Sequence, residues 1–227
     1  MRVLAIDTAL GAASAAVVET GDGAAPALVF SKDMARGHAE ALMPLVAQAL
    51  ESAGGLSAID RIAVTVGPGS FTGLRVGLAC ARALALAGAT PIVGVSTLEA
   101  LAAPSFGRGA AVAAAIDARH GRVFAQGFDA AGAPLAAPAL LPAEAFARAL
   151  PENALVVGSG ADAVIAAAGD RPLRKADGPH HAPNVIVVAR RGAACDPDDA
   201  PPRPLYLKAA DAHPQTGGRI ARRLDES

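Results

Sequence analysis

The order of strand-like and helix-like segments constrains this chain most, because nearly the same order occurs twice along its length. Short apolar runs between Gly-containing turns predict strands, and apolar residues at i, i+3, i+4 and i+7 predict helices. In the first half we expect strands at 3–7, 12–20, 27–32, 62–66 and 91–95. Helices are expected at 38–53, where Pro44 predicts a kink, and at 71–87. A short helix should start at Thr97, the predicted N-cap.

The second half repeats this order more weakly. Strands are expected at 111–117, 122–128, 134–141 and 155–157. Helices are expected at 143–150, 161–168 and 184–194, with irregular structure in the Pro-rich stretch 193–204. The repetition predicts an α/β fold with two duplicated halves of βββαβα type. The expected domains are an N-terminal half at 1–103, a C-terminal half at 104–208 and a polar tail at 209–227.

The composition argues against several classes of protein. Hydrophobic residues make up 52% of the 227 residues, which is enough for a compact core. The formal net charge is −1, with no Trp, one Tyr and six Phe, so the chain lacks the basic surplus and the stacking aromatics of a strong RNA binder. Cys80 and Cys195 stand in no metal-type spacing and are expected to be reduced thiols. The opening residues lack the pattern of a secretion signal, so we expect a cytoplasmic protein.

Residues 71–88 form a long apolar stretch, but they do not predict a membrane span. Arg75 and Arg82 would lie near the middle of a bilayer, at a cost of about 2.5 to 3.5 kcal/mol each. The stretch also carries two internal glycines. We therefore expect a helix of a soluble protein that makes no membrane contact.

Two glycine turns, at 67–70 and 158–160, lie between a predicted strand and a predicted helix. Backbone N–H groups at such a turn favour an anion, and the pairing of these turns with hairpins at Asp7 and Asp117 is typical of the nucleotide clefts of sugar kinases, Hsp70 and actin. Ordinary α/β turn chemistry explains the glycines equally well. Because no Lys or acidic cluster accompanies the first turn, we expect no cofactor and regard four residues as vestigial anion-loop candidates: Thr8, Gly67, Gly69 and Ser70.

Six segments together resemble one protein family. They are "LAIDTA" (4–9), "RGHAEALMPLV" (36–46), "GPGSFTGLRVGLACARALA" (67–85), "GVSTLEALA" (94–102), "AIDARHGRVF" (115–124) and "PLYLK" (204–208). The chain is similar in this way to the TsaB family, also called YeaZ, and "GPGSFTGLR" is the most specific piece. The resemblance covers nearly the whole chain in order.

The TsaB resemblance implies an actin-like double domain and a non-catalytic subunit. In that family the partner, TsaD, transfers threonylcarbamoyl to the adenosine beside the anticodon of tRNAs. A third subunit, TsaE, is an ATPase that docks on the pair. The resemblance implies that tRNA is contacted only through the complex, and it leaves open a homodimer when the chain is alone.

The histidines argue against catalysis by this chain. The catalytic paralogue holds its metal with two imidazoles one helical turn apart, whereas here Leu42 stands four residues after His38. The other four histidines fall in expected loops or in the tail, without complementary spacing: His120, His180, His181 and His213. Ser70 does not lie in a Gly-x-Ser-x-Gly nucleophile elbow. We expect neither a metal nor a catalytic residue. The alternative, from another class, is a stand-alone nucleotide-dependent phosphotransferase or ATPase.

The helix at 71–87 is the expected functional element. Arg75 and Arg82 are its only charges, and Gly73, Gly77 and Ala81 form a small-residue stripe that allows another helix to approach closely. The stripe could pack on the chain's own first helix or on a partner, and the family resemblance favours the partner. The predicted interface is Leu42, Leu45, Val46, Gly73, Leu74, Gly77, Leu78 and Ala81. On this hypothesis, Gly77→Leu weakens association while the separated chain still folds.

Overall fold

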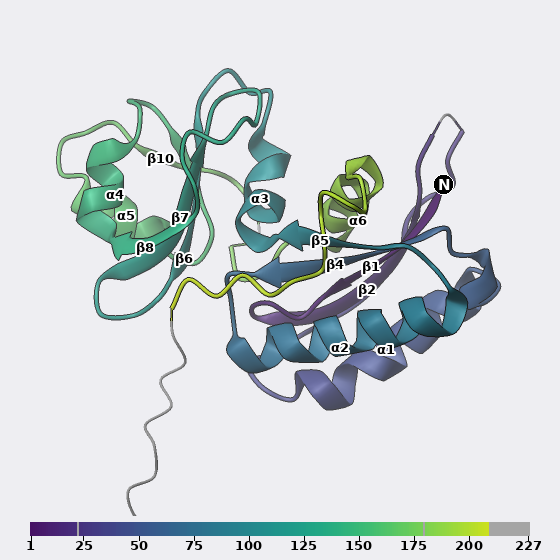
Figure 1. Ribbon diagram of the computed structural model, residues 1–227. Helices are drawn as coiled ribbons and strands as arrows, with labels where there is room; N and C mark the ends of the chain where they lie inside the picture. The colour runs from purple at the N-terminus through teal and green to yellow at the C-terminus, as the bar shows by residue number, and fades with distance from the viewer. Residues whose placement is uncertain (22, 179, 209–227) are drawn as a thin grey trace, which may run out of the picture.

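The computed structural model describes residues 1–21, 23–178 and 180–208 of the chain. The expected polar tail at 209–227 and His213 therefore lie outside the described residues. The described part forms two lobes, each built around one five-stranded sheet (Figure 1).

The first sheet contains the five strands expected in the first half. They are β1 (Arg2–Asp7), β2 (Ala12–Glu19), β3 (Leu28–Asp33), β4 (Arg61–Gly67) and β5 (Ile92–Ser96), in the order β3-β2-β1-β4-β5. β1, β2 and β3 form an antiparallel meander, whereas β1, β4 and β5 run parallel. β1 and β4 are central strands, and both of their faces are covered. Because side chains on both faces are buried, the sequences of both strands are nearly continuous apolar runs.

Helices cover both faces of this sheet. α1 (His38–Ser52) and α2 (Phe71–Gly88) lie on one face, over a core that includes Leu4, Ile6 and Val64. α6 (Val185–Ala194) lies on the opposite face, over Val3 and Ala5. α3 (Thr97–Ala102) contributes to the cores of both lobes, and Figure 1 shows it between them. Two short 3-10 helices complete this part, η1 (Leu56–Ala58) and η2 (Ala103–Ser105).

The second sheet repeats the topology of the first. Its strands are β6 (Val112–Asp117), β7 (Arg122–Phe128), β8 (Ala139–Pro142), β9 (Leu155–Val157) and β10 (Arg174–Lys175), in the order β10-β9-β6-β7-β8. The pairings correspond one for one, since β6, β7 and β8 form an antiparallel meander and β6, β9 and β10 run parallel. α4 (Ala143–Ala149) and α5 (Ala161–Ala167) pack on it. The predicted duplicated α/β fold is confirmed.

Several local predictions need correction. β8 is shorter than the expected strand at 134–141: the start of that stretch contacts β7 only through an isolated bridge of Pro134 to Phe128 and separate hydrogen bonds, and the regular strand begins at Ala139. β10 was not expected, since two exposed basic residues carry no strand pattern. Ser96, not Thr97, caps α3, because its Oγ accepts from the Glu99 N–H at 3.5 Å. α1 continues through Pro44.

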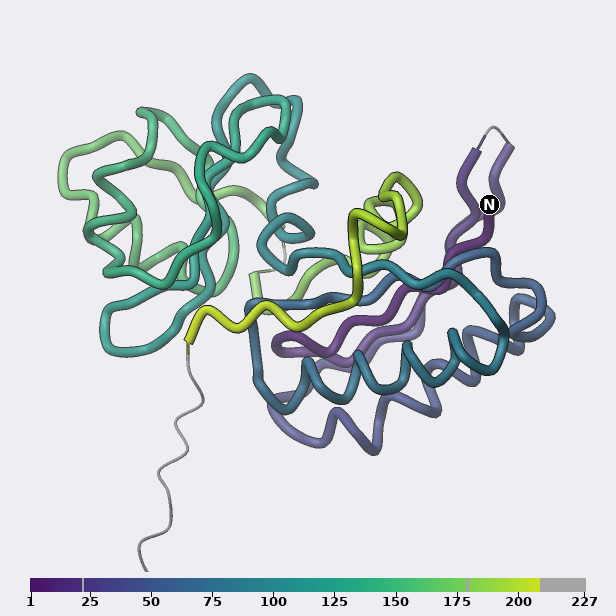
Figure 2. The backbone as a smooth tube through the Cα atoms, viewed as in Figure 1, coloured from purple at the N-terminus to yellow at the C-terminus, as the bar shows by residue number. Residues whose placement is uncertain are grey.

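The expected boundary of the second half, 104–208, also needs correction. α6 packs on β1, β2 and β4 of the first lobe. The segment that follows, residues 195–208, we call the C-terminal strap. It stays on the first lobe, where the Gly94 N–H donates to Ala200 O at 2.8 Å and the Leu205 N–H donates to Val66 O at 2.7 Å. Figure 2 shows the strap, in yellow, running from α6 across the first lobe. The end of the described chain therefore belongs with the N-terminal half.

Candidate functional site

The first glycine turn is closed by the chain's own hairpin. The Ser70 N–H donates to Ala9 O at 2.7 Å, and the Ser70 Oγ caps α2 by accepting from the Gly73 N–H at 3.2 Å. Thr8, buried, donates its hydroxyl to Gly73 O at 2.7 Å. Gly67 ends β4 and lies against Leu205 of the strap. The vestigial anion-loop candidates thus hold the hairpin, α2 and the strap together.

The small-residue stripe of α2 faces this same hairpin. A Cβ on Gly73 would collide with Thr8 O, and a Cβ on Gly69 with Ala9 O. A Cβ on Gly77 would lie 2.5 Å from Thr8 Oγ1. Each of these approaches requires glycine, because real Cβ atoms essentially never come so close to another heavy atom. The spacing of glycines in "GPGSFTGLRVG" is therefore a requirement of packing inside the chain.

The second glycine turn is also occupied by the chain itself. The Gly160 N–H donates to Ala115 O at 2.9 Å, and the Gly158 N–H donates to Nδ1 of His180 at 3.1 Å. On the first lobe, the Gly11 N–H donates to His181 O at 2.9 Å, and Nε2 of His181 lies 3.1 Å from Asp33 Oδ1. His180 and His181 thus connect the two lobes. The N–H groups of Ser70, Gly158 and Gly160, which could bind a phosphate, are thus used within the chain.

Asp7, at the end of β1, is a fully buried carboxyl group. Its Oδ1 accepts from the Thr65 hydroxyl at 2.6 Å and from the Ala9 N–H at 3.1 Å, whereas Oδ2 has no hydrogen-bond partner among the described residues. Burial raises the pKa of Asp7 from 3.8 to about 6, against the opposing effect of the two hydrogen bonds and of nearby His38. The carboxyl is out of reach of any substrate in this conformation, since its residue is 0% exposed.

The titration of Asp7 predicts a pH dependence of stability. Because its folded-state pKa lies above its ordinary value, the folded chain holds the proton more tightly than the unfolded chain does. This stabilisation is present below about pH 4 and is lost by about pH 6, so wild type should lose about 3 kcal/mol relative to Asp7→Asn over that window. Urea unfolding of both proteins across the window measures the difference. A difference that stays constant with pH would contradict the assignment.

The histidine of α1 has a structural role in this conformation. His38 is buried, and its Nε2 lies 2.9 Å from Leu10 O, so the ring ties α1 to the β1–β2 turn. Leu42, one turn later, is in the core. Within the described ranges, no group of three or more His, Cys, Asp or Glu side chains is placed to hold a metal ion.

The predicted interface residues are mostly inside the first lobe. Leu42, Val46, Leu74, Leu78 and Ala81 are at most 3% exposed, Gly73 and Gly77 are buried, and Leu45 is half-buried against the same core. The expectation that these side chains meet a partner is therefore wrong, because the stripe packs on the hairpin at Thr8 and on β4. Ala81 of the stripe also shares a hydrophobic core cluster with Leu42 and Val46 of α1, so the alternative expectation, packing on the chain's own first helix, holds for that residue.

A different face of α1 and α2 is apolar and exposed. Met43 is 53% exposed and Leu86 is 86% exposed. Met43 meets α2 through Cys80, whose Sγ lies 3.6 Å from the Met43 sulfur, and burial raises the pKa of the Cys80 thiol. We call this surface the α1–α2 seam. Its exposed members are Met43, Ala47, Ala79, Ala83 and Leu86, and half-buried Val76 and Cys80 lie between them.

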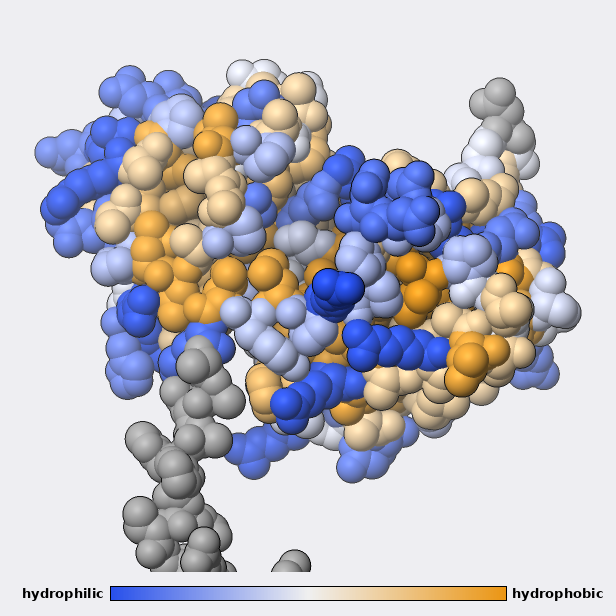
Figure 3. Space-filling view, in the orientation of Figure 1, coloured by the Kyte–Doolittle hydropathy of each residue, from blue (hydrophilic) through white to orange (hydrophobic). Residues whose placement is uncertain are grey.

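α2 has the length and composition of a membrane span, yet it belongs to this layered domain. Its inner residues pack on β1 and β4, while 28% of the helix is buried overall. Arg82 donates to Pro202 O of the strap at 2.6 Å. In the space-filling view, orange and tan surface follows the outer side of α1 and α2, beside blue surface near the strap (Figure 3). The outer side of α2 is therefore a surface that combines apolar and basic parts.

Comparison with solved structures first defines the class of protein. A ROK hexokinase from Thermus thermophilus superposes with a TM-score of 0.52 at 15% identity, covering 86% of this chain and 99% of that one. At this identity the likeness shows the fold alone. Together with the duplicated β3-β2-β1-β4-β5 topology, it makes this chain an α/β protein of the actin-like ASKHA fold.

The family follows from closer matches. YeaZ from Pseudomonas aeruginosa is 31% identical, with a TM-score of 0.73, and the match covers 91% of this chain and 99% of that one. The model of the family "TsaD: tRNA N6-adenosine threonylcarbamoyltransferase" matches residues 16–157. The chain belongs to the TsaB/YeaZ family and shares its sequence pattern with TsaD.

Curated relatives match over a shorter length. The "tRNA threonylcarbamoyladenosine biosynthesis protein TsaB" of Escherichia coli (strain K12) is 42% identical over 127 residues, which are 55% of this chain and 53% of that protein. The match thus spans about half the length of this curated relative.

Proposed function

We propose that this chain is a non-catalytic subunit that binds and activates a TsaD threonylcarbamoyltransferase in forming threonylcarbamoyladenosine next to the anticodon of tRNAs. The name of the Escherichia coli relative supports the pathway. TsaD is the main partner, TsaE is the ATPase expected to dock on the pair, and the chain works in the cytoplasm. Transfer RNA is bound by the complex, and a homodimer of the isolated chain stays an open alternative.

The α1–α2 seam is the observation that carries this proposal. Exposed apolar side chains on neighbouring helices, such as Met43 and Leu86, mark a protein interaction surface when they form a continuous patch. The two helices run side by side (Figures 1 and 2), so a helix pair of similar shape can pack on them as a bundle. TsaD fits this requirement, because this chain shares a family pattern with it. The proposed interface is therefore still on α1 and α2, but it consists of the exposed residues of the α1–α2 seam in place of the buried residues predicted from the sequence.

The alternative function, a stand-alone phosphotransferase or ATPase, receives less support. The backbone donors of Ser70, Gly158 and Gly160 are bonded within the chain. Asp7, the acid at the end of β1, is buried under its own hairpin. A nucleotide would have to displace all of these contacts.

Reconstitution tests the proposed function. The chain, TsaD and TsaE from one organism are combined with tRNA, ATP, threonine and bicarbonate, after addition of the enzyme activity that makes the threonylcarbamoyl donor. Mass spectrometry of tRNA nucleosides should show the modified adenosine only when this chain and TsaD are both present. ATP turnover or phosphotransfer by the chain alone, with a divalent metal, would support the alternative function instead.

A further inference from the structure

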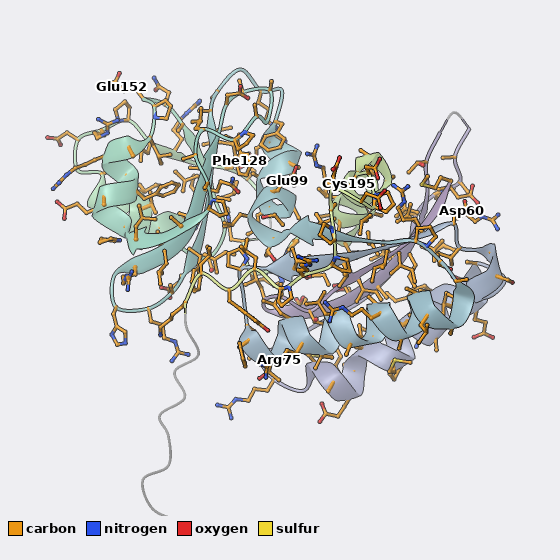
Figure 4. The ribbon with its side chains drawn as sticks, viewed as in Figure 1. Asp60, Arg75, Glu99, Phe128, Glu152 and Cys195 are labelled. Atoms are coloured by element: carbon orange, nitrogen blue, oxygen red, sulfur yellow. The ribbon has the colours of Figure 1, made fainter. Side chains whose placement is uncertain are left out.

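The start of α2 and the C-terminal strap form an exposed aromatic and basic cluster. The Phe71 and Tyr206 rings lie 5.0 Å apart at 38°, and both residues remain about two-fifths exposed, at 39% and 42%. The Arg75 guanidinium lies over the Phe71 ring, 3.8 Å from its centroid, and its Nε donates to the Tyr206 hydroxyl at 3.4 Å. Figure 4 shows Arg75 on the outer side of α2.

Two further arginines extend the positive charge along the strap. Arg82 contacts Pro202 O, and exposed Arg203 follows in sequence. Within the described part of the chain, Arg75, Arg82 and Arg203 form no ion pair, and the Arg203 guanidinium forms no hydrogen bond. A guanidinium carries five N–H donors, so each of these arginines keeps most of its donors for a ligand. We call Phe71, Arg75, Arg82, Arg203 and Tyr206 the arginine–aromatic patch.

The side of the seam that faces α1, at Cys80, and the arginines of this patch lie on different sides of α2. Cys80 contacts Met43 of α1, whereas Arg82 contacts the strap. Two residues apart on an α-helix, these side chains point about 160° away from each other. Arg75 and Arg82 are two turns apart on one side, about 10 Å along the axis. Ala79 and Leu86 of the seam lie within about 60° of both arginines around the axis, so a protein that covers the whole seam adjoins Arg75 and Arg82. Arg203 lies on the strap, outside the seam as defined.

Exposed rings beside unpaired guanidinium groups suit single-stranded RNA. Arginines bind phosphate oxygens through several N–H donors, and exposed aromatic rings stack on unpaired bases. An acidic protein segment would use the arginines but would not need the two rings. Resting on the proposed function, we propose that the arginine–aromatic patch contacts an unpaired region of the tRNA substrate, with Arg82 and Arg203 on phosphates and Tyr206 or Phe71 against a base. The net charge of −1 keeps this contact weak in the isolated chain.

The first test uses the isolated chain and needs no partner. Tyr206 is the only Tyr, and the chain has no Trp, so tyrosine fluorescence reports on the patch alone. At low salt, titration with a single-stranded oligoribonucleotide of about ten nucleotides should quench this fluorescence in a saturable way. Arg203→Glu should weaken the apparent affinity about ten-fold. Its matched control is Arg108→Glu, which changes an exposed arginine in the loop before β6. No saturable quenching, or equal effects of both variants, would overturn the proposal.

The second test separates this inference from the proposed function. In the reconstituted complex, Arg203→Glu should leave association with TsaD unchanged and weaken tRNA binding about ten-fold, with a smaller salt dependence than wild type. Loss of TsaD association in Arg203→Glu would assign the patch to the protein interface and overturn the RNA contact. Normal association with unchanged tRNA affinity would also overturn it, while leaving the proposed function intact. A wild-type chain that does not bind TsaD would overturn the proposed function itself.

Discussion

Gly77→Leu should destabilise the isolated chain strongly, by about 3 kcal/mol or more in the free energy of unfolding. A Cβ at this position lies 2.5 Å from the Thr8 hydroxyl, which is itself bonded to Gly73 O. A leucine must therefore push the β1–β2 hairpin away from α2 and break the Thr8 bond. Urea unfolding of the purified chain measures the change, and the urea midpoint should fall.

The matched control places the same side chain on the other side of α2. Ala79→Leu adds similar volume at an exposed position, so its effect on unfolding should stay within about 0.5 kcal/mol. The sequence alone led to the opposite expectation: with the glycine stripe on the outside of the chain, Gly77→Leu would weaken association with a partner and leave the folding of the separated chain intact. A Gly77→Leu chain with the wild-type midpoint would show that the stripe does not pack on the hairpin.

Ala83→Arg should abolish most association with TsaD and leave the fold intact. Ala83 is exposed on the α1–α2 seam, where a long charged side chain would be buried without a partner in a helix bundle. We expect the dissociation constant to rise about a hundred-fold, with an unfolding midpoint close to wild type. Calorimetric titration of TsaD, together with the modification assay, measures both effects.

Gln48→Arg is the control for the seam. Gln48 is exposed on α1 and lies outside the seam as defined, so the same charge there should change the affinity for TsaD less than three-fold. Equal losses from the two variants would indicate a general charge effect. Normal binding of Ala83→Arg would remove the seam as the docking surface.

Local patterns were sufficient for most of the elements. Strand alternation and helical spacing located β1, β7, β9, α1 and α2 within about two residues, because these signals depend on neighbours in the sequence. β10 was missed because two exposed residues, Arg174 and Lys175, pair with β9 only through their backbone. The family could also be recognised from the sequence alone, since "GPGSFTGLR" is a specific motif.

The placement of α6 and the strap could not be read from local patterns. Arg61 in β4 donates to the carbonyl groups of Gly192, Ala193 and Cys195, more than 130 residues later. Arg191 of α6 pairs with Glu99 of α3. Such contacts bring α6 and the strap back to the first lobe. A division of the sequence into two consecutive halves wrongly assigns these segments to the second lobe.

The sequence by itself determined the duplicated α/β order, the amphipathic α1 and the glycine spacing of α2, because each depends on residues within a few turns or strands. Only the tertiary structure decided which side of α2 faces inward. The Thr8 hydroxyl and carbonyl, 65 residues before Gly73, fill the space beside the glycine stripe. Close packing there leaves the opposite side, from Arg75 to Leu86, exposed. An apolar helix with small residues on one side and alanines on the other fits either orientation in isolation, and the hairpin selects one.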